Sequence, residues 1–221
     1  MAFLITMANL ITDIQAQQRN RSRVNIFLDG NYAFSLDRMA AAWLTTGRQL
    51  SDEDILHLQE KDEYETALNR ALYFLSFRAR SQQEMQSYLL KKGYQPALIE
   101  GVITRLREEK LVDDLDFAQN WVENRQRLRP RSQSVLKFEL RQKGIAESDI
   151  EQALLSSSLD DFELAMKAGR KLTQRYQLLD KLEYTRKLGA ALQRRGFSYS
   201  IVRECLPILW KEKSDSTGVE H

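Results

Sequence analysis

Paired arginines are the residues whose type and spacing could do chemistry in this chain. An Arg-x-Arg-Ser motif occurs twice, 51 residues apart, as Arg78-Ala79-Arg80-Ser81 and Arg129-Pro130-Arg131-Ser132. A guanidinium group is a planar fork of N–H donors that fits carboxylates and phosphates in a defined geometry. The motif therefore predicts a surface that binds phosphates or an acidic protein. Simple solvation of the arginines is the alternative.

The second copy of the motif lies in a basic segment. Residues 125–145 carry seven cations against Glu139 alone, a local charge of +6, although the whole chain has a net charge of only +2. Few aromatic residues interleave this segment, which weakens an interpretation based on base stacking. The residues expected to contact a partner or DNA are Arg78, Arg80, Lys92, Arg125, Arg127, Arg129, Arg131, Lys137, Arg141 and Lys143. Some of these cations are expected near helix C-termini, where the helix dipole also favours them.

Side chains typical of catalysis or metal binding are sparse. The chain has no phosphate-binding glycine loop, no nucleophile elbow and no His-x-x-x-His pair. His57 is interpreted as a solvated side chain and Cys205 as a buried small hydrophobe. The carboxylates Asp113, Asp114 and Asp116 are expected to begin a helix rather than to hold a metal. The sequence therefore predicts a protein that is not an enzyme and that has no metal or cofactor.

Composition places the chain among globular proteins. Of its 221 residues, 43% are hydrophobic and 29% are charged. No apolar run approaches the roughly 20 residues of a membrane-spanning helix, and the first seven residues do not resemble a secretory signal. Met7 is an alternative start to Met1. A single cysteine fits a reducing compartment, so we expect the protein to be cytoplasmic. We also expect it to be a monomer.

A fixed period organises the helices that position the arginines. Gly93, Gly144 and Gly196 are each preceded by a cation, and by apolar residues four and eight positions earlier. Such a period is typical of stacked helical units, whose loops line up along one edge. We expect the paired arginines to form one basic edge of a curved, elongated, mainly α-helical array. The expected three-helix repeats are residues 51–112, 113–157 and 158–213, followed by a polar tail at 214–221.

A small β-sheet extension is expected at residues 1–50, ahead of the repeats. Alternation over residues 9–36 predicts three antiparallel strands, with a tight turn at Asp29-Gly30-Asn31. The residues expected to share faces are Leu10, Thr12, Ile14 and Ala16, then Val24, Ile26 and Leu28, then Tyr32, Phe34 and Leu36. A short helix is predicted at residues 38–44.

Helix-start signals divide the rest of the chain. Ser81-x-x-Glu84 and Ser148-x-x-Glu151 have the spacing of capping boxes. A long helix is predicted from residue 51 to residue 77, with a break near Lys61-Asp62 as an alternative. In the helix that begins at Asp113, the predicted apolar stripe is Phe117, Ala118, Trp121 and Val122.

These motifs together resemble the RecX family of regulatory proteins, modulators of the bacterial RecA recombinase. The resemblance covers about residues 9–210. The matching segments are Asn25-Ile26-Phe27-Leu28-Asp29-Gly30, Arg78-x-Arg80-Ser81-x-x-Glu84-Met85, Leu89-x-x-Lys92-Gly93-Tyr94, Leu111-Val112-Asp113-Asp114-x-x-Phe117-Ala118, Trp121-Val122-x-x-Arg125 and Leu140-Arg141-x-Lys143-Gly144-Ile145.

The resemblance implies three tandem three-helix units without catalytic residues. It also implies that the protein binds RecA filaments in their helical groove and suppresses ATP hydrolysis and strand exchange, in DNA repair, homologous recombination and the SOS response. Some family members bind DNA, so a helical module that acts directly on DNA is the alternative. The third unit lacks the arginine motif and has Lys181-Leu182-Glu183-Tyr184 in its place. The resemblance therefore does not imply that the edge of this unit makes the same contacts.

Overall fold

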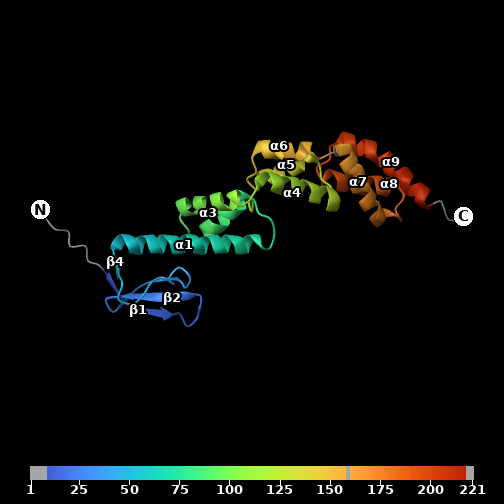
Figure 1. Cartoon of the computed structure of the whole chain (residues 1–221). Coiled ribbons are helices and arrows are strands. Elements are labelled where there is room, and N and C mark those ends of the chain that lie inside the picture. Colours follow the sequence, from blue (N-terminus) through green and yellow to red (C-terminus); the bar gives the residue numbers. More distant parts are fainter. Residues whose placement is uncertain (1–8, 158–159, 218–221) are drawn as a thin grey trace. The chain divides into compact units, whose positions relative to one another are not determined.

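The computed structural model describes residues 9–157 and 160–217, so Met1 and Met7 lie outside the described residues. The chain divides into two compact units, Met1–Phe77 with Leu89–Thr104, and Arg78–Tyr88 with Arg105–His221. The expected fold class, a mainly helical chain of three-helix repeats behind a small N-terminal sheet, is confirmed (Figure 1). The predicted domain limits and the curvature of the array stay predictions.

The N-terminal sheet has four antiparallel strands in the order β3-β2-β1-β4. They are β1 (Asn9–Ala16), β2 (Arg23–Leu28), β3 (Asn31–Asp37) and β4 (Gln49–Leu50). The prediction of three strands was therefore one strand short. β4 has only two residues, too few for an alternation pattern to reveal it.

The face predicted for β1 is correct only in part, because the pairing of β1 with β2 shifts register between Ile11 and Asp13. Beyond this shift, Ile14 packs against the sheet core as predicted. Ile11 is fully buried, whereas Leu10 is 37% exposed. A bulge of this kind inserts a residue into one strand and exchanges the two faces beyond it. The face of β2 is confirmed, while in β3 Tyr32 lies beside a second irregularity and is 58% exposed.

The short helix predicted at residues 38–44 is absent, and this segment forms consecutive turns instead. The Asp37 carboxylate accepts a hydrogen bond of 2.8 Å from the Met39 backbone N–H, as a helix N-cap does, and its carbonyl accepts one of 3.0 Å from Ala41, but the turns that follow do not continue as a helix. Ala41 and Leu44 are buried in the same core as the sheet. Packing against the sheet, rather than helix propensity, therefore determines this segment.

Helix α1 (Asp52–Leu75) is continuous, so the alternative of a break near Lys61 did not occur. Ser51 caps its start in a capping box with Asp54. Asp62 is only 7% exposed and accepts a hydrogen bond of 2.7 Å from Arg23 of β2. The charged residue at the suspected break thus anchors the sheet on α1, which Figure 1 shows running beside it.

Helices occupy most of the remaining chain. They are α2 (Gln82–Lys91), α3 (Pro96–Glu108), α4 (Asp114–Leu128), α5 (Gln133–Arg141), α6 (Glu147–Leu155), α7 (Asp161–Thr173), the short 3-10 helix η1 (Gln174–Tyr176), α8 (Lys181–Gln193) and α9 (Tyr199–Thr217). α9 continues to Thr217 where a polar tail was expected from Ser214, and residues 218–221 lie outside the described chain. Within the described ranges, no helix is long and apolar enough to cross a membrane.

The two predicted capping boxes differ from the structure. The Ser81 hydroxyl accepts a hydrogen bond from the Glu84 backbone N–H at 3.2 Å, but the Glu84 carboxylate binds Arg78 and Lys143 instead of closing the box. The box at Ser148 is wrong, since α6 begins after Ala146 and has no side-chain cap. Ser148 already lies in its first turn.

Each of the last two repeats has its own apolar core. Helices α4, α5 and α6 bury Phe117, Ala118, Val122, Leu136, Leu140, Ile145, Ile150, Ala153 and Leu154. Helices α7, α8 and α9 bury Leu164, Ala165, Met166, Ala168, Leu172, Tyr184, Leu188, Ala191, Leu192, Phe197, Val202, Cys205 and Leu209. Because these cores hold the helices rigidly, side chains on the outer faces have fixed positions relative to one another.

Candidate partner-binding groove

The loop that carries the first arginine motif is held by helix ends from elsewhere in the second unit. The Ser81 hydroxyl donates a hydrogen bond of 2.7 Å to the Lys143 carbonyl at the end of α5. The Gln82 backbone N–H donates to the Asp114 carboxylate at 2.8 Å, at the start of α4. We call this set of contacts the first seam. It fixes residues 78–82 against the second repeat.

The second arginine motif makes an equivalent set of contacts with the third repeat, which we call the second seam. The Ser132 backbone N–H donates to the Arg195 carbonyl at 3.1 Å, and the Gln133 backbone N–H donates to the Asp161 carboxylate at 2.7 Å. The serine and the residue after it therefore serve repeat-to-repeat packing in both copies. In the third repeat the N-cap of α8 is Asp180, and its side chain accepts a hydrogen bond from the Glu183 backbone N–H.

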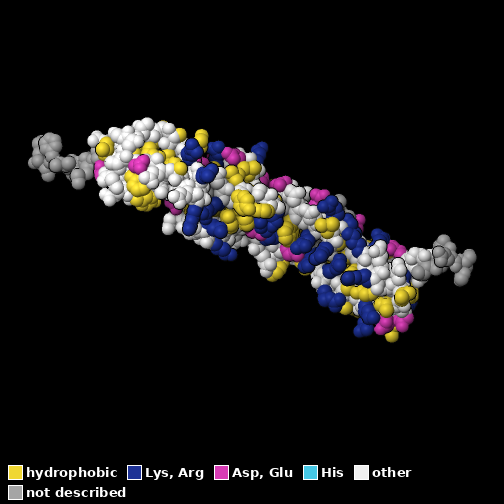
Figure 2. All heavy atoms as spheres, turned by 90° about the horizontal axis from the view of Figure 1, so that it is seen from below, with side chains coloured by type: hydrophobic (Ala, Val, Ile, Leu, Met, Phe, Trp, Pro, Cys, Tyr) yellow, Lys and Arg dark blue, Asp and Glu magenta, His cyan; other side chains and the backbone are white. Residues whose placement is uncertain are grey.

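Basic side chains lie over the helical part of the chain together with hydrophobic ones. Figure 2 shows one face, on which lysine and arginine side chains alternate with hydrophobic and a few acidic side chains. Such a mixed surface suits a partner that offers both apolar and acidic groups.

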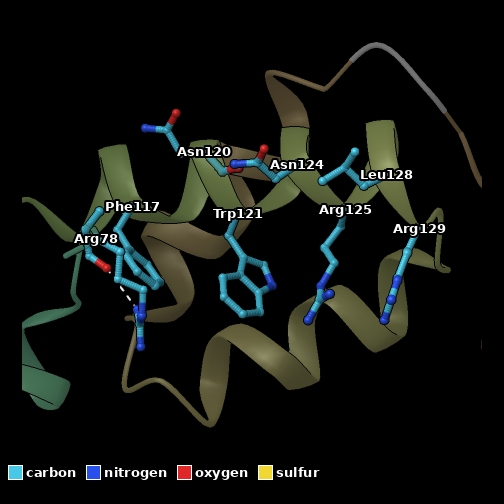
Figure 3. Close-up of a pocket in the computed structure, with 9 residues that line it drawn as sticks. Arg78, Phe117, Asn120, Trp121, Asn124, Arg125, Leu128 and Arg129 are labelled. Carbon is cyan, nitrogen blue, oxygen red and sulfur yellow. Dashed lines mark hydrogen bonds between the residues drawn. The ribbon is translucent and has the colours of Figure 1, made fainter.

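One face of α4 forms an open groove of about 520 Å³. Its helical residues recur at intervals of three and four, and so share one face of the helix. The loop before α2 contributes Arg78 and Ala79 at one end, and Arg129 lies at the other (Figure 3). The residues that line the groove are Arg78, Ala79, Phe117, Asn120, Trp121, Asn124, Arg125, Leu128 and Arg129.

The aromatic floor of the groove is held in place by its neighbours. Phe117 and Trp121 stack with ring centres 5.9 Å apart and planes at 23°. The Trp121 indole N–H donates to the Glu139 carboxylate at 2.9 Å. Arg125 and Lys143 both lie 4.6 Å from the centre of a Trp121 ring, within the range of cation–π attraction. These contacts therefore fix the orientation of the Trp121 indole in the groove.

Glu84, in the first turn of α2, lies next to the first seam and binds two cations. It accepts hydrogen bonds from Arg78 at 3.0 Å and from Lys143 at 2.7 Å. Burial alone would raise the pKa of Glu84, but these two cations outweigh it and hold the pKa at about 2. Glu84 is thus ionised at neutral pH and orients Arg78 at the end of the groove.

Glu139 of α5 also orients groove residues by binding their side chains. It binds Arg125 at 2.8 Å and Arg131 at 3.2 Å, and it also accepts from Trp121. One carboxylate of α5 therefore organises two arginines of the basic segment and the indole of Trp121. The local charge that the sequence shows as nearly unopposed is partly balanced here.

The single basic edge expected from the two motifs forms only in part. Arg78 and Arg129 line the same groove, and Arg125 joins them from α4. Arg131 pairs with Glu139, and burial lowers the pKa of Arg80 from its usual value. Neither of these two lines the groove. The binding role of the candidate residues stays a prediction.

The other candidate cations are dispersed. Lys92 belongs to the first unit, whereas Arg127 donates to Asn124 at 3.2 Å and does not line the groove. Lys137 borders a separate depression beside α6. Arg141 forms an exposed ion pair with Glu147 at 2.7 Å. Arg127, Lys137 and Arg141 are close in sequence to the groove arginines but do not line the groove.

The apolar and amide residues of the groove were missed as binding candidates. Phe117 and Trp121 were expected only as an apolar stripe, and Phe117 is indeed buried at 5% exposed. The sequence signal for the groove was Leu128, because it continues the apolar stripe by two helical turns into the basic segment, next to Arg129. In the structure Leu128 is 62% exposed.

The described residues show little catalytic chemistry. Over residues 9–157 and 160–217, no group of three or more His, Cys, Asp or Glu side chains could hold a metal ion. Asp113 caps α4 as expected, through a hydrogen bond of 3.0 Å from the Asp116 backbone N–H. Cys205 is buried, and burial raises the pKa of its thiol to about 11.

Comparison with protein families matches four consecutive segments of the chain. The N-terminal domain of regulatory protein RecX matches residues 9–51. The first, second and third three-helix domains of RecX match residues 67–106, 113–154 and 159–206. These matches together span most of the chain.

Individual relatives agree with the family models. The chain is 37% identical to the regulatory protein RecX of Bacillus subtilis over 213 residues, which cover 95% of this chain and 81% of the relative. It is 39% identical to the RecX of Bacillus pumilus over 200 residues, covering 89% and 76%.

Two solved structures resemble the chain. A crystal structure of regulatory protein RecX, 29% identical, has a TM-score of 0.64 and covers 89% of this chain and 98% of that one. The RecX of Lactobacillus salivarius, 26% identical, has a TM-score of 0.56 and covers 67% and 97%.

Proposed function

Because the chain belongs to the RecX family of regulatory proteins, we propose that it binds RecA recombinase filaments in the cytoplasm and inhibits their ATPase and strand-exchange activities. It acts without catalysing a reaction and so modulates recombination and DNA repair. The observation that carries the proposal is the groove on α4, where three arginines border a fixed aromatic floor. A regulator needs such a surface and no reactive centre.

A chain of tandem repeats suits a polymeric partner. Several weak contacts along neighbouring filament subunits add through effective concentration, so high avidity needs no single strong site. An occupant that bridges subunits also opposes the rearrangements that accompany nucleotide hydrolysis.

The direct test measures the single-strand-dependent ATPase of the cognate recombinase with increasing amounts of this protein. We expect the rate to fall as the protein approaches stoichiometry with filament subunits. An unchanged rate at stoichiometric concentration would contradict the proposed function. Imaging of the same mixtures distinguishes blocking of the filament groove from capping of growing ends and from disassembly.

The groove is tested by charge reversal at Arg129, which is exposed at the end of α4. Arg129→Glu, alone or with Arg131→Glu, should weaken inhibition at least ten-fold, since an attractive contact becomes a repulsive one. Arg127→Glu, two residues away and outside the groove, is the matched control and should inhibit like the wild type. Intact inhibition by the Arg129 and Arg131 double variant would show that this surface is not used.

Direct DNA binding is the second candidate function, and the local charge of +6 at residues 125–145 favours it. Binding that depends on phosphates weakens steeply with salt, because neutralising them releases counterions. A DNA-binding module should bind an oligonucleotide at micromolar or tighter affinity at low salt, without recombinase. Weaker binding would exclude DNA as the main ligand.

A further inference from the structure

Arginines from three places in the second unit interact electrostatically around Arg195, at the second seam. Arg129 and Arg131 come from the loop before α5, Arg195 from the end of α8, and Arg175 from η1. The Arg195 guanidinium lies 3.5 Å from the Pro130 carbonyl, between the two loop arginines. We call these four residues the arginine cluster.

The cluster carries more positive charge than its surroundings neutralise. Among the ion pairs of the described residues, Glu139 binds Arg131, and no carboxylate binds the other three arginines of the cluster. Partial burial, together with Arg131, Arg129 and Arg175 nearby, lowers the pKa of Arg195 from its usual value. Positive charges held together in this way attract an anionic ligand, which relieves their mutual repulsion.

The arginine cluster is continuous with the groove on α4. Arg129 belongs to both. Figure 3 shows it at the end of the row of Phe117, Trp121 and Arg125, while Leu128 lies with Asn120 and Asn124 on the other side of α4. Leu128 is 62% exposed and Trp121 is partly exposed. The groove that ends at the arginine cluster therefore contains exposed apolar surface on Trp121 and Leu128.

We propose that the groove and the arginine cluster together bind an acidic and apolar peptide segment of a protein partner. Apolar side chains of the segment pack on Leu128 and on the part of Trp121 that its neighbours leave exposed, and the carboxylates that follow them pair with Arg129 and Arg195. If the proposed function holds, this segment belongs to the recombinase subunit, and in that respect the inference rests on it.

The surroundings favour a peptide over a nucleic acid strand. Stacking platforms for bases need a free aromatic face, but the Trp121 ring already stacks on Phe117 and lies 4.6 Å from both Arg125 and Lys143. Hydrophobic side chains also interrupt the basic ones on the face in Figure 2.

Binding of labelled peptides tests the inference without the recombinase. The probe is a fluorescein-labelled 12-residue peptide with Leu and Phe in its first half and Glu and Asp in its second. Its controls replace either the acidic residues by Gln and Asn or the apolar residues by Ser. We expect the full peptide to bind at least ten-fold tighter than either control, because each half supplies one kind of contact. Equal binding of all three peptides would contradict the inference.

Variants of the full chain locate the site. Arg129→Glu and Leu128→Ser should each weaken peptide binding, Arg129→Glu by ten-fold or more. Arg127→Glu and Leu178→Ser are the matched controls outside the groove, since Leu178 is fully exposed on another repeat. Unchanged binding by Arg129→Glu and Leu128→Ser would overturn the proposed site.

An oligo(dT) probe of 20 nucleotides separates the two ligand classes in the same assay. If oligo(dT) bound more tightly than the peptide, and Arg129→Glu abolished this binding, the ligand of the site would be a nucleic acid strand. That result would contradict the inference. Failure of the proposed function gives a different result, because the wild-type chain would then bind the peptide but leave the recombinase ATPase unchanged.

Discussion

The Ser81 hydroxyl donates a hydrogen bond of 2.7 Å to the carbonyl of Lys143, 62 residues later in the chain. Ser81 is fully buried, and the bond joins the start of α2 to the end of α5. Gly144 follows at once with φ of +75°, in the left-handed region where glycine is favoured. A helix start and a helix end from different repeats thus meet with little space between them.

Replacing Gly144 should cost more stability than replacing Gly93, which has φ of +90°. A Cβ at residue 144 would lie 2.6 Å from the Cβ of Gln83, whereas a Cβ at residue 93 meets nothing within 4 Å. Both alanine variants carry the strain of positive φ, about 1–2 kcal/mol. Gly144→Ala should lose roughly 1–3 kcal/mol more, as overpacked sites do.

Urea denaturation of the two alanine variants measures this difference. Gly196→Ala should behave like Gly144→Ala, because its Cβ would overlap Val135 and Ser132 at the second seam. Equal unfolding free energies for the variants at residues 93 and 144 would show that the first seam can open without cost.

Glu84 should make stability depend on pH. The folded-state pKa of about 2 lies below the usual value of 4.5, so the stabilisation is fully present above about pH 4.5 and is lost as pH falls toward 2. Since the group is partly exposed, solvent screening reduces the effect to roughly 1–2 kcal/mol. Glu84→Gln should therefore be less stable than wild type at pH 7, and the gap should close on acidification.

Denaturation curves at several pH values between 7 and 2 check the prediction for Glu84. The control is Glu147→Gln, which breaks the exposed ion pair with Arg141 and should change stability little. A gap between wild type and Glu84→Gln that stays constant down to pH 2 would mean that the ion pairs of Glu84 contribute nothing through its ionisation.

Asp62 should be a stabilising anchor of the N-terminal sheet. It is 7% exposed and accepts hydrogen bonds from Arg23 at 2.7 Å and from the Asp37 backbone N–H at 2.6 Å. Asp62→Ala leaves both donors without this acceptor and should cost roughly 3 kcal/mol. Asp62→Asn keeps an acceptor for Asp37 and should cost less.

Hydrogen exchange over β2 and β3, with thermal unfolding, measures the effect of Asp62. Glu109→Ala, which removes an exposed ion pair with Arg105, is the control and should cost below about 1 kcal/mol. If Asp62→Ala and Glu109→Ala were equally stable, the buried ion pair would not anchor the sheet.

The Cys205 thiol should not react in the folded protein. It is fully buried, and burial raises its pKa to about 11, so almost no thiolate exists at pH 8. A disulfide reagent at pH 8 should leave the native chain unmodified and should modify it fully in concentrated urea. Rapid modification of the native chain would show that the third repeat opens readily.

Local rules explain which parts of the fold could be predicted. The helix start at Asp113 and the repeat glycines Gly93, Gly144 and Gly196 depend on a few neighbouring residues, so spacing alone revealed them. The turns at residues 38–44 and the bulge near Ile11 depend on packing within the sheet core. No local pattern contains that information.

The sequence by itself determined the repeats, their glycine ends and the charge of the basic segment, because periodicity and composition are properties of the chain. Only the tertiary structure decided which arginines meet. Glu139 takes Arg131 away from the groove, while residues 78 and 129, separated by 51 positions, line it together. The physical reason is that the ion pairing and burial of an arginine depend on its distance from other side chains. Those distances are set by tertiary contacts between residues that are far apart in the sequence.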